Sequence, residues 1–224
     1  MKYEFTGETM NYEGHILHRI RNLGNGELGG WIEKKENLSQ EGNCWVDDNA
    51  KVFDNAKVYD NAQVYGYARV YGDAEVYGNA IVAGKAQVYG GAKIYDTAVV
   101  CDNAIVCGNA KVYGIAGIYG NPRIYDNAEV YGNAEVHGDA KVFGAMKIFS
   151  GEYSSGEFFG KNELMIVFSH ESYMYFVTEE KSAGKAFDRW LEACDNAGFN
   201  IDNMMVTEVV LRDANGNDID EMKL

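Results

Sequence analysis

Valine or isoleucine occupies every sixth position of this chain from Val46 to Ile148, eighteen times without a slip. A second position, four residues after each of these, is alanine from Ala50 to Ala140, with Pro122 as the one exception. An α-helix needs apolar residues that recur about every 3.6 residues, whereas a six-residue recurrence with β-branched and aromatic neighbours suits very short strands joined by tight turns. Such a repeat indicates a solenoid of stacked coils.

The internal order of each hexad fits one strand and one corner, as in VYDNAQ at 58–63. The aliphatic residue is predicted to point inward and the following residue, usually aromatic, to point outward, because side chains alternate along a strand. Gly or Asp then precedes Asn, Asp or Gly, which are residues that tolerate the positive φ of a tight corner. The alanine fits where the chain crowds the interior just past that corner.

This repeat resembles the hexapeptide-repeat family, whose chains wind as a left-handed parallel β-helix of triangular cross-section. The resemblance covers residues 44–150. It implies three hexads in each coil, so that residues 18 apart stack and the eighteen hexads give about six coils. The chain departs from the family pattern because thirteen of the eighteen residues after the aliphatic are aromatic. In addition, GELGGWIEKKENLSQEGNCWV (26–46) is similar to the lead-in of a group of phage and prophage proteins labelled as transferases.

The predicted fold is therefore an all-β solenoid with an added unit at each end. Residues 1–43 hold two β-like runs and a glycine-rich stretch, and we predict that they form an N-terminal β cap. The β-helix occupies 44–150, and SGEYSSGEFFG (150–160) is predicted to be a turn-rich linker. Residues 151–224 are predicted to form a small C-terminal α+β domain of ββαβ order, with strands at 163–169, 173–179 and 204–212 and a helix at 182–199.

Charge and cysteine spacing exclude several classes of function. The formal net charge is −14, of which −9 lies in residues 151–224, so neither nucleic acid nor an anionic membrane is an expected partner. No apolar run of about 18 residues and no signal-peptide pattern occurs, which predicts a cytoplasmic protein, in the host cytoplasm if a phage encodes it. The four cysteines lie in no metal-ligand spacing, so we expect reduced thiols and no metal.

Stacking at 18-residue intervals sorts the outward side chains into three walls. One wall, named face A here, carries Gln63, Ile81, Val99, Gly117 and Glu135 in one column and Tyr65, Ala83, Cys101, Tyr119 and His137 in the next. The predicted interface residues on it are Ile81, Ala83, Val99, Cys101, Gly117 and Tyr119. A monomer does not normally leave such an apolar patch in water. We predict that a homotrimer covers it, as in many hexapeptide-repeat proteins, and docking of the chain's own C-terminal domain is the alternative.

His137 is the one histidine among the repeats, and Glu135 is its neighbour on face A. Resemblance to the hexapeptide acyltransferases implies a histidine general base at a subunit boundary and an acyl-coenzyme A bound between prisms, so His137 and Glu135 are the candidate catalytic residues. However, the six-residue rhythm never breaks between Val46 and Ile148 to house a substrate loop. The carbonic anhydrases of this fold bind zinc through three histidines, whereas these repeats contain one.

The sequence thus favours a non-catalytic binding or scaffold protein, encoded by a phage or prophage, that oligomerises through face A. Its expected target is a host protein or a small molecule, for instance in blunting host defence, and no cofactor is expected. The alternative is an acyltransferase that uses acetyl-coenzyme A and His137.

Two other histidines, His15 and His18 in GHILHRI, alternate with apolar residues and are predicted to lie on a strand surface.

Overall fold

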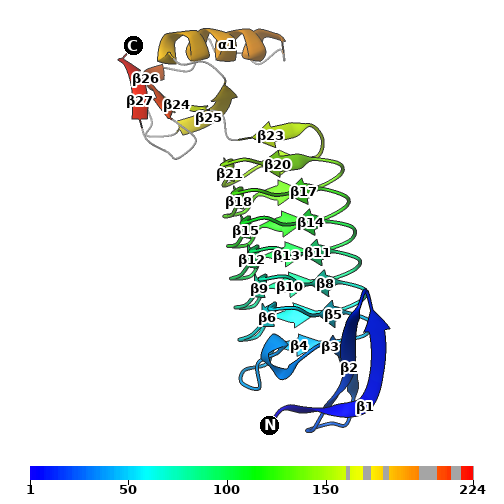
Figure 1. Ribbon diagram of the computed structural model, residues 1–224. Helices are drawn as coiled ribbons and strands as arrows, with labels where there is room; N and C mark the ends of the chain where they lie inside the picture. The colour runs from blue at the N-terminus through cyan, green and yellow to red at the C-terminus, as the bar shows by residue number, and fades with distance from the viewer. Residues whose placement is uncertain (160–161, 169–172, 179–181, 197–205, 213–217, 224) are drawn as a thin grey trace. The chain divides into compact units, whose positions relative to one another are not determined.

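The computed structural model of the protein describes residues 1–159, 162–168, 173–178, 182–196, 206–212 and 218–223. These residues fall into two compact units, Met1–Phe159 and Gly160–Leu224. Figure 1 shows the first unit as a parallel solenoid of short strands, with the hairpin of β1 (Tyr3–Tyr12) and β2 (His15–Asn22) beside its first coils. The predicted β-solenoid is confirmed, while the left-handed sense of its winding stays a prediction.

Three parallel sheets form the walls of the solenoid. Face A is the seven-stranded sheet of β4 (Trp45–Val46), β7 (Gln63–Val64), β10 (Ile81–Val82), β13 (Val99–Val100), β16 (Gly117–Ile118), β19 (Glu135–Val136) and β22 (Glu152–Tyr153). Face C is the six-stranded sheet of β6 (Lys57–Val58), β9 (Glu75–Val76), β12 (Lys93–Ile94), β15 (Lys111–Val112), β18 (Glu129–Val130) and β21 (Lys147–Ile148).

Face B belongs to the ten-stranded sheet, in which β1 pairs antiparallel with β2, and β2 pairs antiparallel with the first strand of the solenoid. Its other strands are β3 (Leu28–Ile32), β5 (Lys51–Val52), β8 (Arg69–Val70), β11 (Gln87–Val88), β14 (Ile105–Val106), β17 (Arg123–Ile124), β20 (Lys141–Phe143) and β23 (Glu157–Phe159). The hairpin is therefore continuous by hydrogen bonding with one wall of the solenoid.

Strand register agrees with the 18-residue interval through the repeats. Ile81 pairs with Val99 and Val99 with Gly117, while the inner residues Val82 and Val100 pair in the same ladder. The aliphatic and alanine positions of the hexads are almost completely buried and make one continuous core. Each fully buried aliphatic side chain contributes about 1.5 to 3 kcal/mol of transfer free energy, offset by the entropy lost on ordering the chain.

The solenoid extends beyond the repeats at both ends and has about seven coils, where about six were predicted. At its start, β3, the 3₁₀ turn η1 (Lys35–Asn37) and β4 form a first coil, in which Ile32 pairs with Val52 and Leu38 with Val58. Those partners are 20 residues apart, so this coil is out of phase with the hexads. Sequence periodicity alone therefore assigned its buried residues to a cap.

The predicted linker at 150–160 is wrong, because β22 and β23 continue two of the parallel sheets. Tyr153 takes the inward position that follows Val136, and Phe158 takes the one that follows Val142. The intervals here are 17 and 16 residues, so the six-residue rhythm is lost although the stacking continues. The Tyr153 and Phe158 rings meet edge to face at 4.9 Å and pack against the end of the core.

The corners explain why aspartate and glycine share one position of the hexad. Six aspartates there have a positive φ of 53 to 60°, namely Asp48, Asp54, Asp60, Asp96, Asp102 and Asp126. In each case the residue one coil later is glycine, and its backbone N–H donates to the aspartate Oδ2 over 2.9 to 3.2 Å. Aspartate tolerates this left-handed backbone because its short polar side chain bonds locally. The corner carboxylates are thus engaged by the backbone of the next coil.

Face C carries an unbroken column of stacked tyrosine rings. Their centroids are 4.8 to 5.0 Å apart and their planes differ by 3 to 9°, and the column consists of Tyr59, Tyr77, Tyr95, Tyr113 and Tyr131. Neighbouring charges pair along the same wall, with Lys111 Nζ 3.0 Å from Glu129 Oε1. Because the rings stack face to face, the column presents ring edges to solvent.

The stacked tyrosines are expected to ionise together with alkaline unfolding. Burial, joined by the charges of Tyr77, Asp96 and Glu129, raises the pKa of Tyr95 to about 12. A raised folded-state pKa means that its contribution to stability is complete below the ordinary value of 10 and is lost as the pH rises through about 12. Tyrosinate absorbance and circular dichroism, recorded in one alkaline titration, should therefore change together. Complete ionisation of this column with the β signal intact would contradict the expectation.

The described residues of the second unit form a four-stranded antiparallel sheet and one helix. The strand order is β25 (Tyr173–Thr178), β24 (Asn162–Phe168), β26 (Val206–Arg212) and β27 (Asp218–Lys223), and α1 spans Ala183–Asn196. Trp190 and Ala186 of α1 pack against Val209 and Leu211. The predicted strands and helix are present, although their predicted residues 169, 179, 197–199 and 204–205 lie outside the described residues, and β27 is an addition that its acidic sequence concealed. No helix in the described part of the chain has the length and apolarity needed to cross a membrane.

Candidate functional site

Face A brings the predicted interface residues together on one wall. Gln63, Ile81, Val99, Gly117 and Glu135 follow one another in the parallel ladder of β7, β10, β13, β16 and β19. Ala83 is 6 % exposed, and the side chains of Ile81, Val99 and Cys101 are half-buried. A Cβ added at Gly117 would meet only ordinary contacts at 3.5 Å or more, so the wall has room for another group at this point.

Two exposed apolar residues at the edges of face A were missed by the sequence analysis. Ile115 is 70 % exposed at the corner that leads into β16, and Tyr67 is 61 % exposed at the corner that follows Tyr65, itself 41 % exposed. Within residues 46–148 these three are the large hydrophobic side chains that are exposed. They could have been found as apolar residues in a corner position that is otherwise mostly Asn, Asp, Lys or Gly.

His137 and Glu135 both lie on face A, but Tyr119 is the group that engages each of them. The Tyr119 hydroxyl donates to Glu135 Oε2 at 2.6 Å, and the His137 ring stacks on Tyr119 with 5.0 Å between centroids. The hydrogen bond to Glu135, followed by burial and the negative charge of Glu135, raises the pKa of Tyr119 to about 12. Catalysis by His137 and Glu135 stays a prediction.

Cys101 is the sulfur-containing residue of face A, and its thiol is favoured over its thiolate. Burial, together with the charge of Asp102, raises the pKa of Cys101. A thiolate, and not a thiol, is the nucleophile and the metal ligand in proteins. Cys101 therefore contributes a small apolar surface to this wall.

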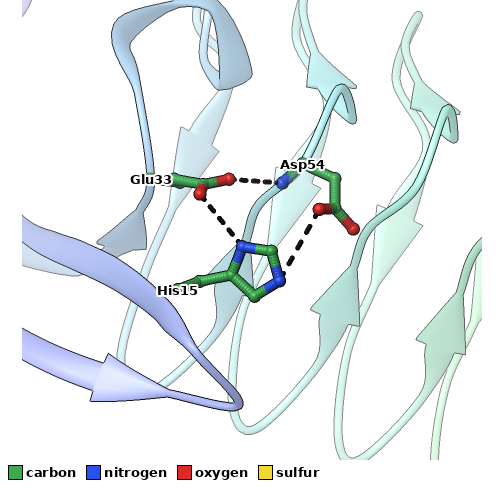
Figure 2. A group of neighbouring side chains, drawn as sticks. All are labelled: His15, Glu33 and Asp54. Atoms are coloured by element: carbon green, nitrogen blue, oxygen red, sulfur yellow. Dashed lines mark hydrogen bonds and ion pairs between the residues drawn. The ribbon is translucent and has the colours of Figure 1, made fainter.

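A second cluster joins three segments that are distant in the sequence, His15, Glu33 and Asp54 (Figure 2). His15 Nδ1 lies 2.9 Å from Glu33 Oε1, and His15 Nε2 lies 3.6 Å from Asp54 Oδ1. The side chains are 28, 28 and 36 % exposed. His15 comes from the hairpin and the two carboxylates come from the solenoid, so the cluster bridges the two. His15 lies on the surface of a strand, β2, as predicted, but its two carboxylate partners were not predicted, and His18 stacks on Phe5.

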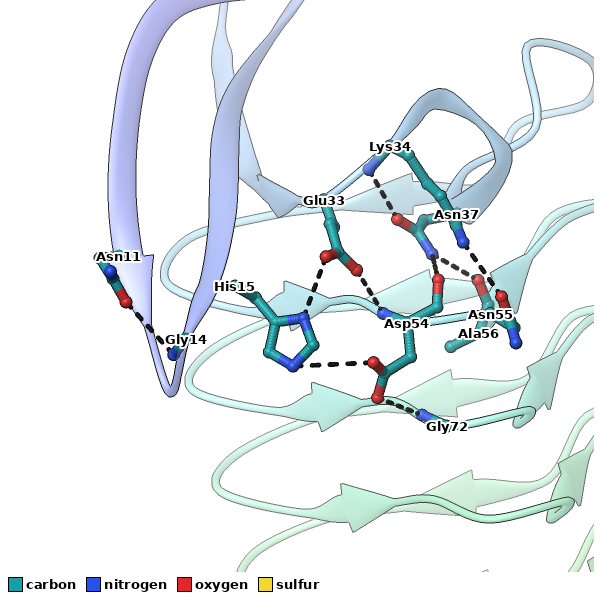
Figure 3. Close-up of polar contacts among 10 residues, drawn as sticks. All are labelled: Asn11, Gly14, His15, Glu33, Lys34, Asn37, Asp54, Asn55, Ala56 and Gly72. Atoms are coloured by element: carbon teal, nitrogen blue, oxygen red, sulfur yellow. Dashed lines mark hydrogen bonds and ion pairs between the residues drawn. The ribbon is translucent and has the colours of Figure 1, made fainter.

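Backbone donors fix the two carboxylates of this cluster (Figure 3). The N–H of Asp54 donates to Glu33 Oε2 at 2.7 Å, and the N–H of Gly72 donates to Asp54 Oδ2 at 3.1 Å. Each carboxylate therefore keeps its other oxygen for the imidazole. The corner of the chain that contains Asp54 is fixed by the buried Asn37 amide, which donates to the carbonyl oxygens of Asp54 and Ala56.

The tip of the hairpin positions His15. Glu13 and Gly14 form a two-residue turn with φ of 52 and 93°, values that suit the twist of a tight hairpin. The Asn11 side chain supports the turn by accepting from the N–H of Gly14 at 3.2 Å. His15 follows directly, and its ring contacts the Phe53 ring with 4.9 Å between centroids.

The sequence comparison agrees with the fold. Residues 74–90, about one coil of face C, face A and face B in turn, match the family model described as YdcK Beta solenoid repeat. The repeat is of the hexapeptide β-solenoid type. None of the curated proteins matches the chain in sequence. The comparisons therefore support a β-solenoid repeat and indicate no function for the chain.

Electrostatics on this β-solenoid favour a charged imidazole between two carboxylates. The hydrogen bond to Glu33, helped by the charges of Glu33, Asp54 and Glu13 and opposed by burial, raises the pKa of His15. Burial acts to raise the pKa of Glu33, but the bonds from His15 and from the Asp54 N–H outweigh it and lower that pKa.

The same three residues are the one metal-compatible group in the described part of the chain. Their carboxylates flank opposite nitrogens of the ring, as Figure 2 shows. One ring nitrogen and one oxygen of each carboxylate nevertheless lie within 4.8 Å of one another. The group of His15, Glu33 and Asp54 is named the clasp here.

Proposed function

We propose that the protein is a non-catalytic binding or scaffold protein, encoded by a phage or prophage, whose solenoid forms a homotrimer through face A. The observation that carries this proposal is the placement of exposed apolar residues. Tyr65, Tyr67 and Ile115, the exposed large hydrophobics of residues 46–148, all lie on face A or at its edges. The half-buried Ile81 and Val99 lie between them. Contiguous apolar surface of this kind marks an interaction site.

A parallel trimer suits this surface because its contacts are heterologous, with a corner of one protomer against a wall of the next. In a parallel arrangement equal coils lie at equal heights. Ile115 and Gly117 belong to the same coil, and Gly117 leaves room on the wall. The corner residue Ile115 of one protomer would then fill the space at Gly117 of its neighbour. Such complementary shapes would make the contact between copies specific.

The trimer would display three copies of an acidic C-terminal unit, since residues 160–224 hold 13 acidic and 6 basic side chains and so carry −7 of the net charge of −14. Its target would be a host protein or a small molecule held between prisms in the cytoplasm. The acyltransferase alternative is weakened by geometry, because the carboxylate beside His137 is bonded to the Tyr119 hydroxyl. A general base needs a partner that orients it, as well as access to the substrate proton.

Sedimentation of the full chain tests the proposal. We expect the wild-type protein to sediment as a trimer and the double variant Ile81→Asp/Val99→Asp to sediment as a folded monomer, because six carboxylates would be placed in one apolar interface. Ile105→Asp is the matched control, since Ile105 occupies the same outward strand position on face B. A monomeric wild type, or a trimer that survives the double substitution, would overturn the assembly. Acetyl-coenzyme A turnover that is lost in His137→Ala would favour the enzyme instead.

A further inference from the structure

The tip of the β1–β2 hairpin covers the start of an aromatic column on face B. Phe53 is 3 % exposed, and its ring stacks on that of Tyr71 with 5.0 Å between centroids and parallel planes. Tyr89 continues the column at 4.9 Å from Tyr71. Two residues of the tip lie on Phe53, Tyr12 at 6.0 Å and His15 at 4.9 Å between ring centroids. Displacement of the tip would open this end of the column to solvent.

Two sets of polar contacts hold the tip. In one, Arg69 Nη1 donates to the Tyr12 hydroxyl at 2.9 Å and lies 3.3 Å from Glu13 Oε1, while Lys51 Nζ sits 4.9 Å above the Tyr12 ring. The other is the clasp of His15. Arginine keeps its charge at all relevant pH values, whereas histidine is the side chain that changes charge between about pH 5 and 8. Only the clasp can therefore make the hold on the tip depend on pH in this range.

We propose that the tip of the β1–β2 hairpin is a pH-sensitive lid over the aromatic column of face B, held closed by protonated His15 between Glu33 and Asp54. The geometry carries the proposal, since both ring nitrogens face carboxylate oxygens and both carboxylates are fixed by backbone donors (Figure 3). A neutral imidazole has one N–H and can donate to only one of the two carboxylates. Deprotonation thus removes one donor and the positive charge together. The lid lies on face B and does not depend on assembly through face A.

The sign of the effect follows from the groups that face His15, which are Glu33, Asp54 and Glu13. Each is acidic, so protonation of the ring is favoured when the lid is closed. Stabilisation by His15 is complete below its ordinary pKa of 6.5 and is lost as the pH rises through its raised pKa. Stabilisation by Glu33 is complete above its ordinary pKa of 4.5 and is lost as the pH falls through its lowered pKa. The lid is held most firmly between these two ordinary values.

Amide hydrogen exchange of the full chain, read by mass spectrometry and corrected for the intrinsic pH dependence of exchange, tests the lid. Protection of residues 11–16 should fall about tenfold from about pH 5.5 to about pH 8.5, the size of one charge-assisted hydrogen bond. Strands inside the solenoid should keep their protection. His15→Asn should show the low protection at both pH values, and His18→Asn, which alters the other histidine of the hairpin, should behave as the wild type.

Three results would overturn the lid. One is equal protection of the tip at both pH values in the wild type. Another is a His15→Asn variant that keeps the wild-type pH dependence, which would assign it to another group. The third is protection at the higher pH that Zn²⁺ restores and a chelator removes, which would make the cluster a metal site. Titration of the His15 ring protons by NMR gives a second measure that does not rely on a variant, and a ring that titrates below pH 6.5 would contradict the clasp.

Discussion

Val100→Asp is expected to unfold the solenoid, although its neighbour Val99 should accept the same change. Val100 is fully buried at mid-length, where its side chain is surrounded by the stacked aliphatic and alanine residues of adjacent coils. A carboxylate there has no partner, and an uncompensated buried charge costs about 3 to 5 kcal/mol. Domains are stable by about 5 to 15 kcal/mol, so a loss of this size should abolish or severely lower the thermal transition. Circular dichroism during heating measures it.

Val99→Asp supplies the control, because the two residues are adjacent but point to opposite sides of β13. The outward carboxylate on face A can reach water in a single chain, so the folding transition should remain within about 0.5 kcal/mol of wild type. Val99→Asp should weaken trimer formation instead. If Val99→Asp unfolds the chain as readily as Val100→Asp, the assignment of inward and outward positions is incorrect.

Gly84→Val has the second largest expected effect, since it combines backbone strain with a clash. Gly84 has a φ of 67°, and a Cβ at this position would lie 2.8 Å from the backbone nitrogen of Asp102 in the next coil. A β-branched residue in the left-handed region costs about 1 to 2 kcal/mol, and overpacking adds about 1 to 3 kcal/mol. Urea unfolding should therefore show a loss of about 2 to 5 kcal/mol.

Asp102→Gly is the matched variant in the next coil of the same corner column. It keeps the positive φ of 59° and removes only the side chain that accepts from the Gly120 N–H at 2.9 Å. Loss of one such hydrogen bond costs about 1 kcal/mol. Gly84→Val should lose more unfolding free energy than Asp102→Gly. Equal losses would show that a β-branched side chain meets no clash at this corner.

Periodicity predicted those parts of the fold in which coils keep one length. The hexads from Val46 to Ile148 stack as expected because identical spacing places identical residues in register. The first coil was missed because Ile32 and Leu38 stack on residues 20 positions later, and the last one because Tyr153 stacks 17 positions from Val136. Unequal coil lengths remove the periodic signal, whereas the hydrogen bonds and the core continue.

The sites divide in the same way. Face A could be predicted because its residues share one column of the repeat, and the edge residues Ile115 and Tyr67 fall on corners that break its pattern. The clasp of His15 could not, because Glu33 and Asp54 approach it only after the hairpin packs on the solenoid. Such a site depends on tertiary contacts among three segments, and no local spacing records it.

The pairing of aspartate with glycine at the corners restricts how the length of this protein can change. Removal of residues 91–108, one whole coil, would bring only glycine onto glycine or glycine onto aspartate in the three corner columns. Removal of residues 73–90 takes away Gly78 and places Asp60 against Asp96. Two carboxylates would then lie one strand spacing, about 4.8 Å, apart. The solenoid can therefore lose a whole coil at some positions and not at others.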